Sequence, residues 1–185
     1  VAVTGNEPTT LARDLDALIA RLRAEAGIDI ARADSLAQAN LIIERMPRAR
    51  LQTGLPGAGC FAMAHARSLA ELKRLQAQGL TWSNFVQRDA AFIAIPRDAT
   101  PMRARTCLHE EIGHALGPMN DLPQLASSVF TDIQTHRVLT AHDMLMLRIT
   151  YDRALRTADR LSTYRQICAQ VAREFDLIAC FMSKP

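Results

Sequence analysis

The segment TCLHEEIGHALGPMND, residues 106–121, contains histidine and acidic side chains at helical spacing. The predictions of the fold and of the functional site both depend on it. A Thr-Pro pair at 100–101 precedes it, which is typical of a helix N-cap followed by proline at the first helical position. We therefore predict a helix from residue 101 to about 116. At 100° per residue, two faces separate. The predicted core face holds Leu108, Ile112, Ala115 and Leu116, and the opposite face holds Arg103, Cys107, Glu110 and His114.

The two histidines of this segment invite comparison with HExxH, in which two His four residues apart bind one zinc ion. His109 and His114 are five residues apart, so they point about 140° from each other around the helix. A motif that starts at His109 places Gly113 at the second ligand position, and glycine offers no ligand atom. A frame shifted by one residue, EEIGHALG, places Glu110 and His114 at the two ligand positions and Glu111 at the catalytic one.

In the shifted frame, the third ligand position falls at Asn120, with Asp121 next to it. A carboxylate is an accepted zinc ligand and an amide is a poor one. The predicted metal ligands are therefore Glu110, His114 and Asp121, and Glu111 is the general base if the site is active. Such a set is only weakly selective for zinc. Zinc is compatible with it, but we favour a site without metal.

Without a metal, this polar helix face is expected to be satisfied by hydrogen bonds, because buried carboxylates need partners. Arg103 is placed to help. Asp121 then ties the turn after the helix through side chain–backbone bonds. We expect His142 to make a structural hydrogen bond and His136 to be exposed to solvent.

GHALG, residues 113–117, is similar to the zinc helix of metzincin metalloproteases. SSVF at 127–130 falls at the place of their Met-turn, with Val129 in the place of methionine, and residues 139–152 resemble their C-terminal helix. A more specific resemblance, over roughly residues 90–155, is to domain of unknown function 2927, a bacterial family. It departs at His114, where that family has Gln. The residues that carry this resemblance are Cys107, Glu110, Glu111, His114, Leu116, Gly117, Asn120, Asp121, Ser128–Phe130, Thr140, His142, Asp143, Leu147, Arg148, Tyr151 and Asp152.

The resemblance and the element pattern together predict one α+β domain over residues 1–185, of zincin/metzincin type. It would combine an N-terminal helix, a small twisted mixed sheet, the central helix and a helical C-terminal part. We expect the strand at 90–96 to edge a cleft with the central helix at its floor. The other predicted elements are a helix at 9–26 capped by Thr9 or Thr10 and ended by Gly27, β-prone segments at 28–32, 40–46 and 59–66, a helix at 68–79, a loop at 117–139, a helix capped by Thr140, and a last helix at 162–178.

The missing imidazoles at positions 110 and 120 favour a metallopeptidase-like pseudoenzyme that binds a peptide or protein in its cleft. The alternative is a divergent zinc metallopeptidase that hydrolyses peptide bonds with Glu111 as the general base. A third hypothesis is a purely structural envelope protein.

Four cysteines allow two disulfides in three possible connectivities. We favour Cys60–Cys107 and Cys168–Cys180, and four buried reduced thiols are the alternative. Lys and Arg total 22 against 19 Asp and Glu, but they are scattered along the helices, so we expect no nucleic-acid partner. No apolar run reaches the roughly 18 residues of a membrane span. We expect a periplasmic or otherwise exported protein whose signal or lipid anchor is absent from this sequence, and a cytoplasmic location stays open. The sequence leaves the oligomeric state undetermined.

Overall fold

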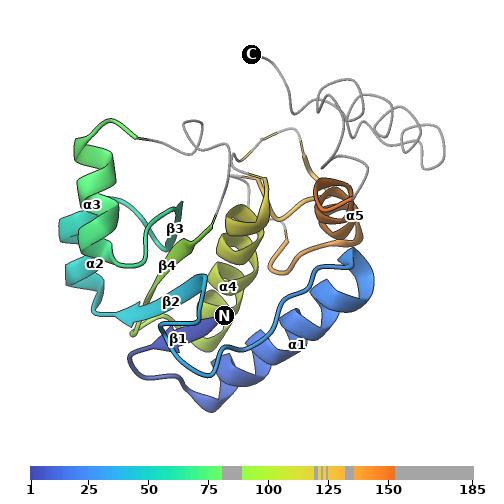
Figure 1. Cartoon of the computed structure of the whole chain (residues 1–185), viewed down its shortest axis with the longest axis horizontal. Coiled ribbons are helices and arrows are strands. Elements are labelled where there is room, and N and C mark those ends of the chain that lie inside the picture. The colour runs from blue at the N-terminus through green and yellow to red at the C-terminus, as the bar shows by residue number, and fades with distance from the viewer. Residues whose placement is uncertain (81–88, 119–120, 122, 124, 132–135, 153–185) are drawn as a thin grey trace.

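The computed structural model describes residues 1–80, 89–118, 121, 123, 125–131 and 136–152. In this part of the chain, a four-stranded mixed sheet carries helices on both faces (Figure 1). The strands are β1 (Ala2–Thr4), β2 (Leu41–Met46), β3 (Phe61–Ala64) and β4 (Ala91–Pro96). The helices are α1 (Thr9–Ala26), α2 (Arg48–Gly54), α3 (Leu69–Ala77), α4 (Pro101–Leu116) and α5 (Ala141–Thr150). The expected mixture of α and β elements is confirmed.

The strands lie in the order β1-β2-β4-β3. β1, β2 and β4 are parallel, whereas β3 is antiparallel to β4. Parallel neighbours need a long crossover, and α1 provides it between β1 and β2. The predicted position of the strand at 90–96 was wrong: β4 lies inside the sheet, paired on both sides. β3 is the outermost strand of the described sheet at this end.

Two hydrophobic cores lie on the two faces of the sheet. α1, α4 and α5 cover one face, and α2 and α3 lie on the other (Figure 1). β4 contributes to both cores, because its side chains alternate: Ile93 and Ile95 pack under α4, and Phe92 and Ala94 pack under α3. All six residues of β4 are buried, as a strand covered on both faces requires.

The predicted helix boundaries of α1 and α4 are confirmed. Gly27 ends α1 in the left-handed region at a φ of 67°, which glycine adopts without steric cost. The predicted cap of α1 was wrong, because Pro8 occupies the N-cap and no side chain caps the helix there. The predicted caps of the later helices hold. The Thr100 hydroxyl accepts from Arg103 N–H at the start of α4, and Thr140 opens α5 in a capping box.

Three segments differ from the sequence-based prediction. Residues 28–32 form no strand, because Ile28 and Ile30 are buried as parts of a loop that runs to β2. The three-residue β1 and the short α2 were not predicted at all. The predicted helix at 162–178 lies outside the described residues. Among the helices that are described, none combines the length and apolar character needed to cross a bilayer.

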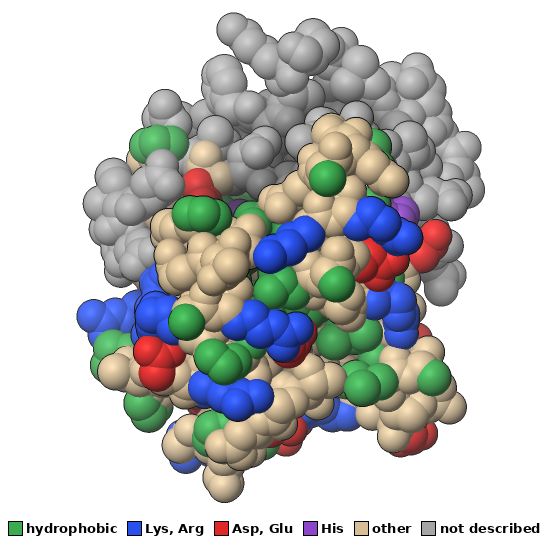
Figure 2. Space-filling model, turned by 90° about the vertical axis from the view of Figure 1, so that its left-hand side faces the viewer, with side chains coloured by type: hydrophobic (Ala, Val, Ile, Leu, Met, Phe, Trp, Pro, Cys, Tyr) green, Lys and Arg blue, Asp and Glu red, His purple; other side chains and the backbone are tan. Residues whose placement is uncertain are grey.

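The surface of the described part mixes charges of both signs. On the face shown in Figure 2, Lys and Arg side chains are spread among acidic and hydrophobic ones. Several arginines are paired with carboxylates, such as Arg48 with Asp98 at 2.9 Å and Arg50 with Glu44 at 2.7 Å. On that face the basic side chains are therefore interspersed with other kinds.

Candidate functional site

The central helix α4 packs between the sheet and the helices α1 and α5. Its core face is fully buried, with Leu108 and Ile112 at 0% exposure. At Gly113 the helix backbone comes so close to Phe130 that an added Cβ would lie 2.4 Å from the Cζ atom of that ring. Glycine therefore permits the close approach of the 127–130 segment to the polar end of α4.

His109 lies apart from the Glu110–His114 cluster on α4, as its angle around the helix predicts, and its role is structural. Its side chain is 5% exposed, and its Nδ1 atom accepts a hydrogen bond of 3.2 Å from the backbone N–H of Leu139. Burial lowers the pKa of His109 to about 4, and the charges of Arg105 and Arg21 act in the same direction. His109 is thus a neutral acceptor that fastens α4 to the segment before α5.

The three predicted metal ligands come together at the C-terminal end of α4. One ligand atom from each of Glu110, His114 and Asp121 lies within 4.8 Å of the other two. The Nε2 atom of His114 is 3.4 Å from Oδ1 of Asp121, and its Nδ1 atom is 2.8 Å from the carbonyl oxygen of Pro118. The other candidate for the third position, Asn120, lies outside the described residues.

His114 is a cation in this arrangement. Burial by itself lowers the pKa of an imidazole, but here it is outweighed. The hydrogen bond to Asp121, the charge of Glu111 and the carbonyl of Pro118 together raise the pKa of His114 to about 9. The ring also packs on Phe130, with centroids 4.9 Å apart. A protonated His114 therefore supplies the positive charge that faces the acidic side chains of the cluster.

Glu111, the predicted general base, is buried with 6% exposure. Burial is the main reason that the pKa of Glu111 rises to about 8; the charges of Glu110 and Asp121 add to it, and those of His114 and Arg103 oppose it. Burial therefore disfavours the ionised form of Glu111 when no cation is bound, and the positive charge of His114 opposes this effect. A nearby positive charge would favour its ionised form.

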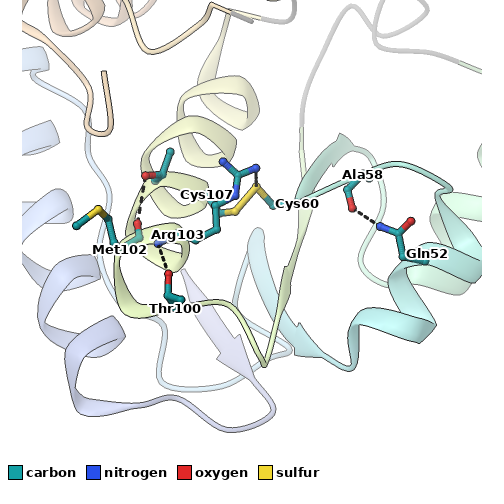
Figure 3. The surroundings of a disulfide bond; sticks show 8 residues. Gln52, Ala58, Cys60, Thr100, Met102, Arg103 and Cys107 are labelled. Atoms are coloured by element: carbon teal, nitrogen blue, oxygen red, sulfur yellow. Dashed lines mark hydrogen bonds between the residues drawn. A yellow bond between two sulfur atoms is a disulfide. The ribbon is translucent and has the colours of Figure 1, made fainter. Parts of the chain in front are cut away.

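A disulfide joins the outermost strand to the central helix. Cys60, which directly precedes β3, is bonded to Cys107 on α4, with their Cα atoms 5.9 Å apart (Figure 3). This confirms the first of the two predicted pairings. The second, Cys168–Cys180, falls outside the described residues. The Arg103 guanidinium lies beside the bond, with Nη2 3.9 Å from the sulfur of Cys60 and 2.6 Å from the place that a Cβ at Gly59 would take.

The buried carboxylate of Asp143 helps to fix the segment at 127–130 to α5. Asp143 is fully buried and accepts from the Ser128 hydroxyl at 2.5 Å and from Val129 N–H at 3.1 Å. It also accepts from the N–H of Thr140 at 2.7 Å, which closes the capping box. The sequence pattern predicted Asp143 only as a helix-capping acid. Its second role places Phe130 under His114.

The two remaining histidines near this region make structural contacts. His142 Nδ1 is 2.8 Å from the Ser127 hydroxyl, which confirms the predicted structural bond. His136, expected to be exposed, is half-buried, and its Nε2 atom is 2.9 Å from the carbonyl of Ala126. His136 also lines a cavity of about 260 Å³ at the start of α4, together with Arg103 and Arg137.

If Glu110, Asp121 and His114 act as ligands, they would offer a divalent cation two carboxylates and one imidazole. A metal-binding His usually donates its second ring N–H to a carbonyl or carboxylate, which fixes the tautomer. Pro118 provides such a carbonyl for Nδ1 of His114, and this leaves Nε2 directed toward Asp121. Sequence reasoning missed Pro118 and Phe130, because a backbone carbonyl and a packing ring have no motif of their own.

Comparison with known proteins gives one family. Searches of curated proteins and of solved structures find no match. The sequence model of one family, described as "Protein of unknown function (DUF2927)", matches residues 1–167 of the 185. That match includes every element described above and the whole Glu110–Glu111–His114–Asp121 cluster. The chain therefore belongs to the DUF2927 family.

Proposed function

We propose that this chain is a metallopeptidase-like domain with a degenerate cation site, and that it binds an extended peptide or protein segment along β3. The observation that carries the proposal is the joining of β3 to α4 by the Cys60–Cys107 disulfide. This bond holds the outermost strand of the described sheet beside Glu110 and Glu111, which follow Cys107 within about one turn of α4. A backbone-binding edge and a cluster of ionisable groups thus lie next to each other.

The geometry of β3 indicates which of its backbone groups a peptide would meet. In an antiparallel pair, the residues alternate between those that bond the partner strand and those that point away from it. His65 N–H bonds the carbonyl of Ala90 at 2.7 Å, so Met63 and Phe61 also face β4. Ala62 and Ala64 then direct their N–H and C=O groups away from β4. Because these residues are only 4% and 0% exposed, this edge must open before a peptide can add to it as a further strand.

Efficient hydrolysis is not part of this proposal, because two features weaken it. The cluster has one imidazole where a working metzincin-type site has three. Burial raises the pKa of Glu111 to about 8 when no cation is bound, whereas a general base must be ionised to accept a proton. Both features favour binding over catalysis.

Amide hydrogen exchange tests peptide binding directly. The probe is a mixture of short synthetic peptides of random sequence, added to the isotope-labelled protein. Binding along β3 predicts that the amides of Ala62 and Ala64 become protected, whereas those of Phe61 and Met63 are protected with and without peptide. Unchanged exchange at Ala62 and Ala64 at saturating peptide would refute the proposal.

The cluster itself favours a second candidate, a divergent metallopeptidase. Glu110, His114 and Asp121 would hold the cation, and Glu111 would act as the general base for a bound water. A bound cation would also lower the pKa of Glu111 and so ionise it. Zinc-loaded protein that cleaves fluorogenic peptides, with cleavage lost in Glu111→Gln while zinc is retained, would establish this candidate. No cleavage by the zinc-loaded protein would leave the binding function alone.

A further inference from the structure

We infer that the chain has a second metal site, controlled by the redox state of its disulfide, in which the Cys60 thiolate joins Glu110 and Glu111. The Cys60 sulfur and one carboxylate oxygen from each glutamate lie within 4.8 Å of one another. In the oxidised chain Cys60 is bonded to Cys107, and a sulfur in a disulfide has no thiolate to offer a metal. The site therefore exists only after reduction. It goes beyond the proposed function and does not depend on peptide binding.

The redox step needs one reductant, a dithiol. The Cys60–Cys107 bond takes up two electrons and two protons and breaks into two thiols, while the dithiol is oxidised to a disulfide. When a divalent metal binds, the Cys60 thiol releases its proton to the solvent and its sulfur forms the bond to the metal. Cys107 is left as a buried thiol on α4.

Charge favours Cys60 as the ligand. The Nη2 atom of Arg103 lies 3.9 Å from the Cys60 sulfur, so its positive charge stabilises a thiolate there. Three anionic ligands, Cys60, Glu110 and Glu111, are balanced by a divalent cation together with Arg103. Cys107 is fully buried and belongs to no such group among the described residues.

Glu111 provides an independent reason to expect a cation here. Its side chain is more than nine-tenths buried, and its carboxylate lies beside the Cys60 sulfur and Glu110. A buried carboxylate is costly in its ionised form unless it is paired, and metal coordination is one way to pair it. The two sites share Glu110, so they compete for it. Thiolate also makes the reduced site softer, and softer sites favour zinc or cobalt(II) over harder cations.

Two single variants separate this site from simple loss of the disulfide. Cys107→Ser and Cys60→Ser both remove the bond, but only the first leaves the Cys60 thiol. Cys168 and Cys180 are replaced by serine in both proteins and in their parent. With Co²⁺ under nitrogen, Cys107→Ser should show thiolate-to-cobalt charge-transfer absorption, and Cys60→Ser should not. Charge transfer of equal strength in both variants, or in neither, would overturn the inference.

A second measurement uses the natural chain and does not require the variants to fold. The chain is reduced with dithiothreitol, freed of reductant, and alkylated with iodoacetamide with and without Zn²⁺, and each cysteine is read by mass spectrometry. Zinc should slow the alkylation of Cys60 by at least about tenfold, the scale on which metal sites respond to altered ligation. Equal alkylation of Cys60 with and without zinc would contradict the site.

Further substitutions distinguish this site from the one formed with His114. In the Cys107→Ser background, His114→Ala should leave the charge-transfer band, because His114 is not one of its ligands. Glu111→Gln should weaken cobalt binding by about tenfold or more. If His114→Ala removes the band and Glu111→Gln does not, the thiolate belongs to a different ligand set and the inference fails. A failure of zinc binding by the oxidised protein would concern the first site alone.

Discussion

The ring of Phe130 packs against the imidazole of His114, with ring centroids 4.9 Å apart and an angle of 46° between the ring planes. Phe130 is 1% exposed and also fills the space over Gly113. The Phe130 side chain thus packs against the His114 side of the cluster and determines how closely the 127–130 segment approaches α4. The geometry of the cluster depends on this packing as much as on the ligands themselves.

Gly113→Ala should destabilise the fold. The new Cβ would lie 2.4 Å from Cζ of Phe130 and 3.1 Å from a Leu139 methyl group. Overpacking of this kind costs about 1–3 kcal/mol, and it opposes the gain of about 1 kcal/mol that alanine brings to a helix interior. We expect a net loss in the free energy of unfolding, measured by urea denaturation.

A paired variant checks the cause of that loss. Phe130→Leu removes the ring atoms that the new methyl group would meet. The double variant should therefore lose less stability than the sum of the two single variants. A Gly113→Ala protein that is more stable than the natural chain would show that the ring moves away without cost.

Asp143→Asn should destabilise the protein more than a surface substitution of the same type. The buried carboxylate accepts from Ser128, Val129 and Thr140, and an amide has only one oxygen to accept with. Hydrogen bonds to charged groups contribute about 1.5–3 kcal/mol each. Asp34→Asn, at an exposed position, is the matched control. Equal free energies of unfolding for the two variants would contradict the role of Asp143.

His109 should make the fold weaker in mild acid. The pKa of His109 is about 4 in the folded chain and 6.5 in the unfolded one. Above pH 6.5 the group is neutral in both states and contributes nothing. As the pH falls from 6.5 to 4, only the unfolded chain takes up the proton, so stability falls. The limiting loss is about 3 kcal/mol at 1.36 kcal/mol per pKa unit.

The pH dependence of His109→Gln isolates this contribution. Glutamine can still accept the Leu139 N–H, but it does not titrate. The difference in unfolding free energy between the natural chain and the variant should therefore shift between pH 6.5 and 4 and be constant above that range. A difference that does not change with pH would mean that the pKa of His109 is the same in the folded and unfolded chains.

Local chemistry predicted much of the fold. The capping box of Thr140 and Asp143 can be predicted from four consecutive residues. The start of α4 can likewise be predicted from the adjacent residues Thr100 and Pro101. The angle between His109 and His114 followed from helix geometry alone. These features depend only on residues within one or two helical turns, so they can be predicted from the sequence alone.

The parts that could not be predicted depend on contacts distant in sequence. β1 has only three residues, and it is a strand because residues 2–4 pair with residues 42–44 of β2. Ile28 and Ile30 alternate with polar residues as in a strand, yet they are buried side chains of a loop. Alternation of apolar residues indicates which side chains are buried, and it does not show that the backbone pairs with another strand. Pro118 contributes to the cluster through its carbonyl, which no side-chain motif reveals.

In both proposed functions Glu110, His114 and Asp121 form one cation site, which the missing imidazoles weaken in the first. Zinc calorimetry tests this central claim most directly. The oxidised protein is used, purified without chelator, so that Cys60 remains in its disulfide. His114→Ala removes the only imidazole of the set, and His136→Ala is the matched histidine control. We predict one zinc ion per chain for the natural protein and for His136→Ala, with affinity at least about tenfold weaker in His114→Ala. No zinc binding by the natural protein, or equal affinity in His114→Ala, would contradict the claim.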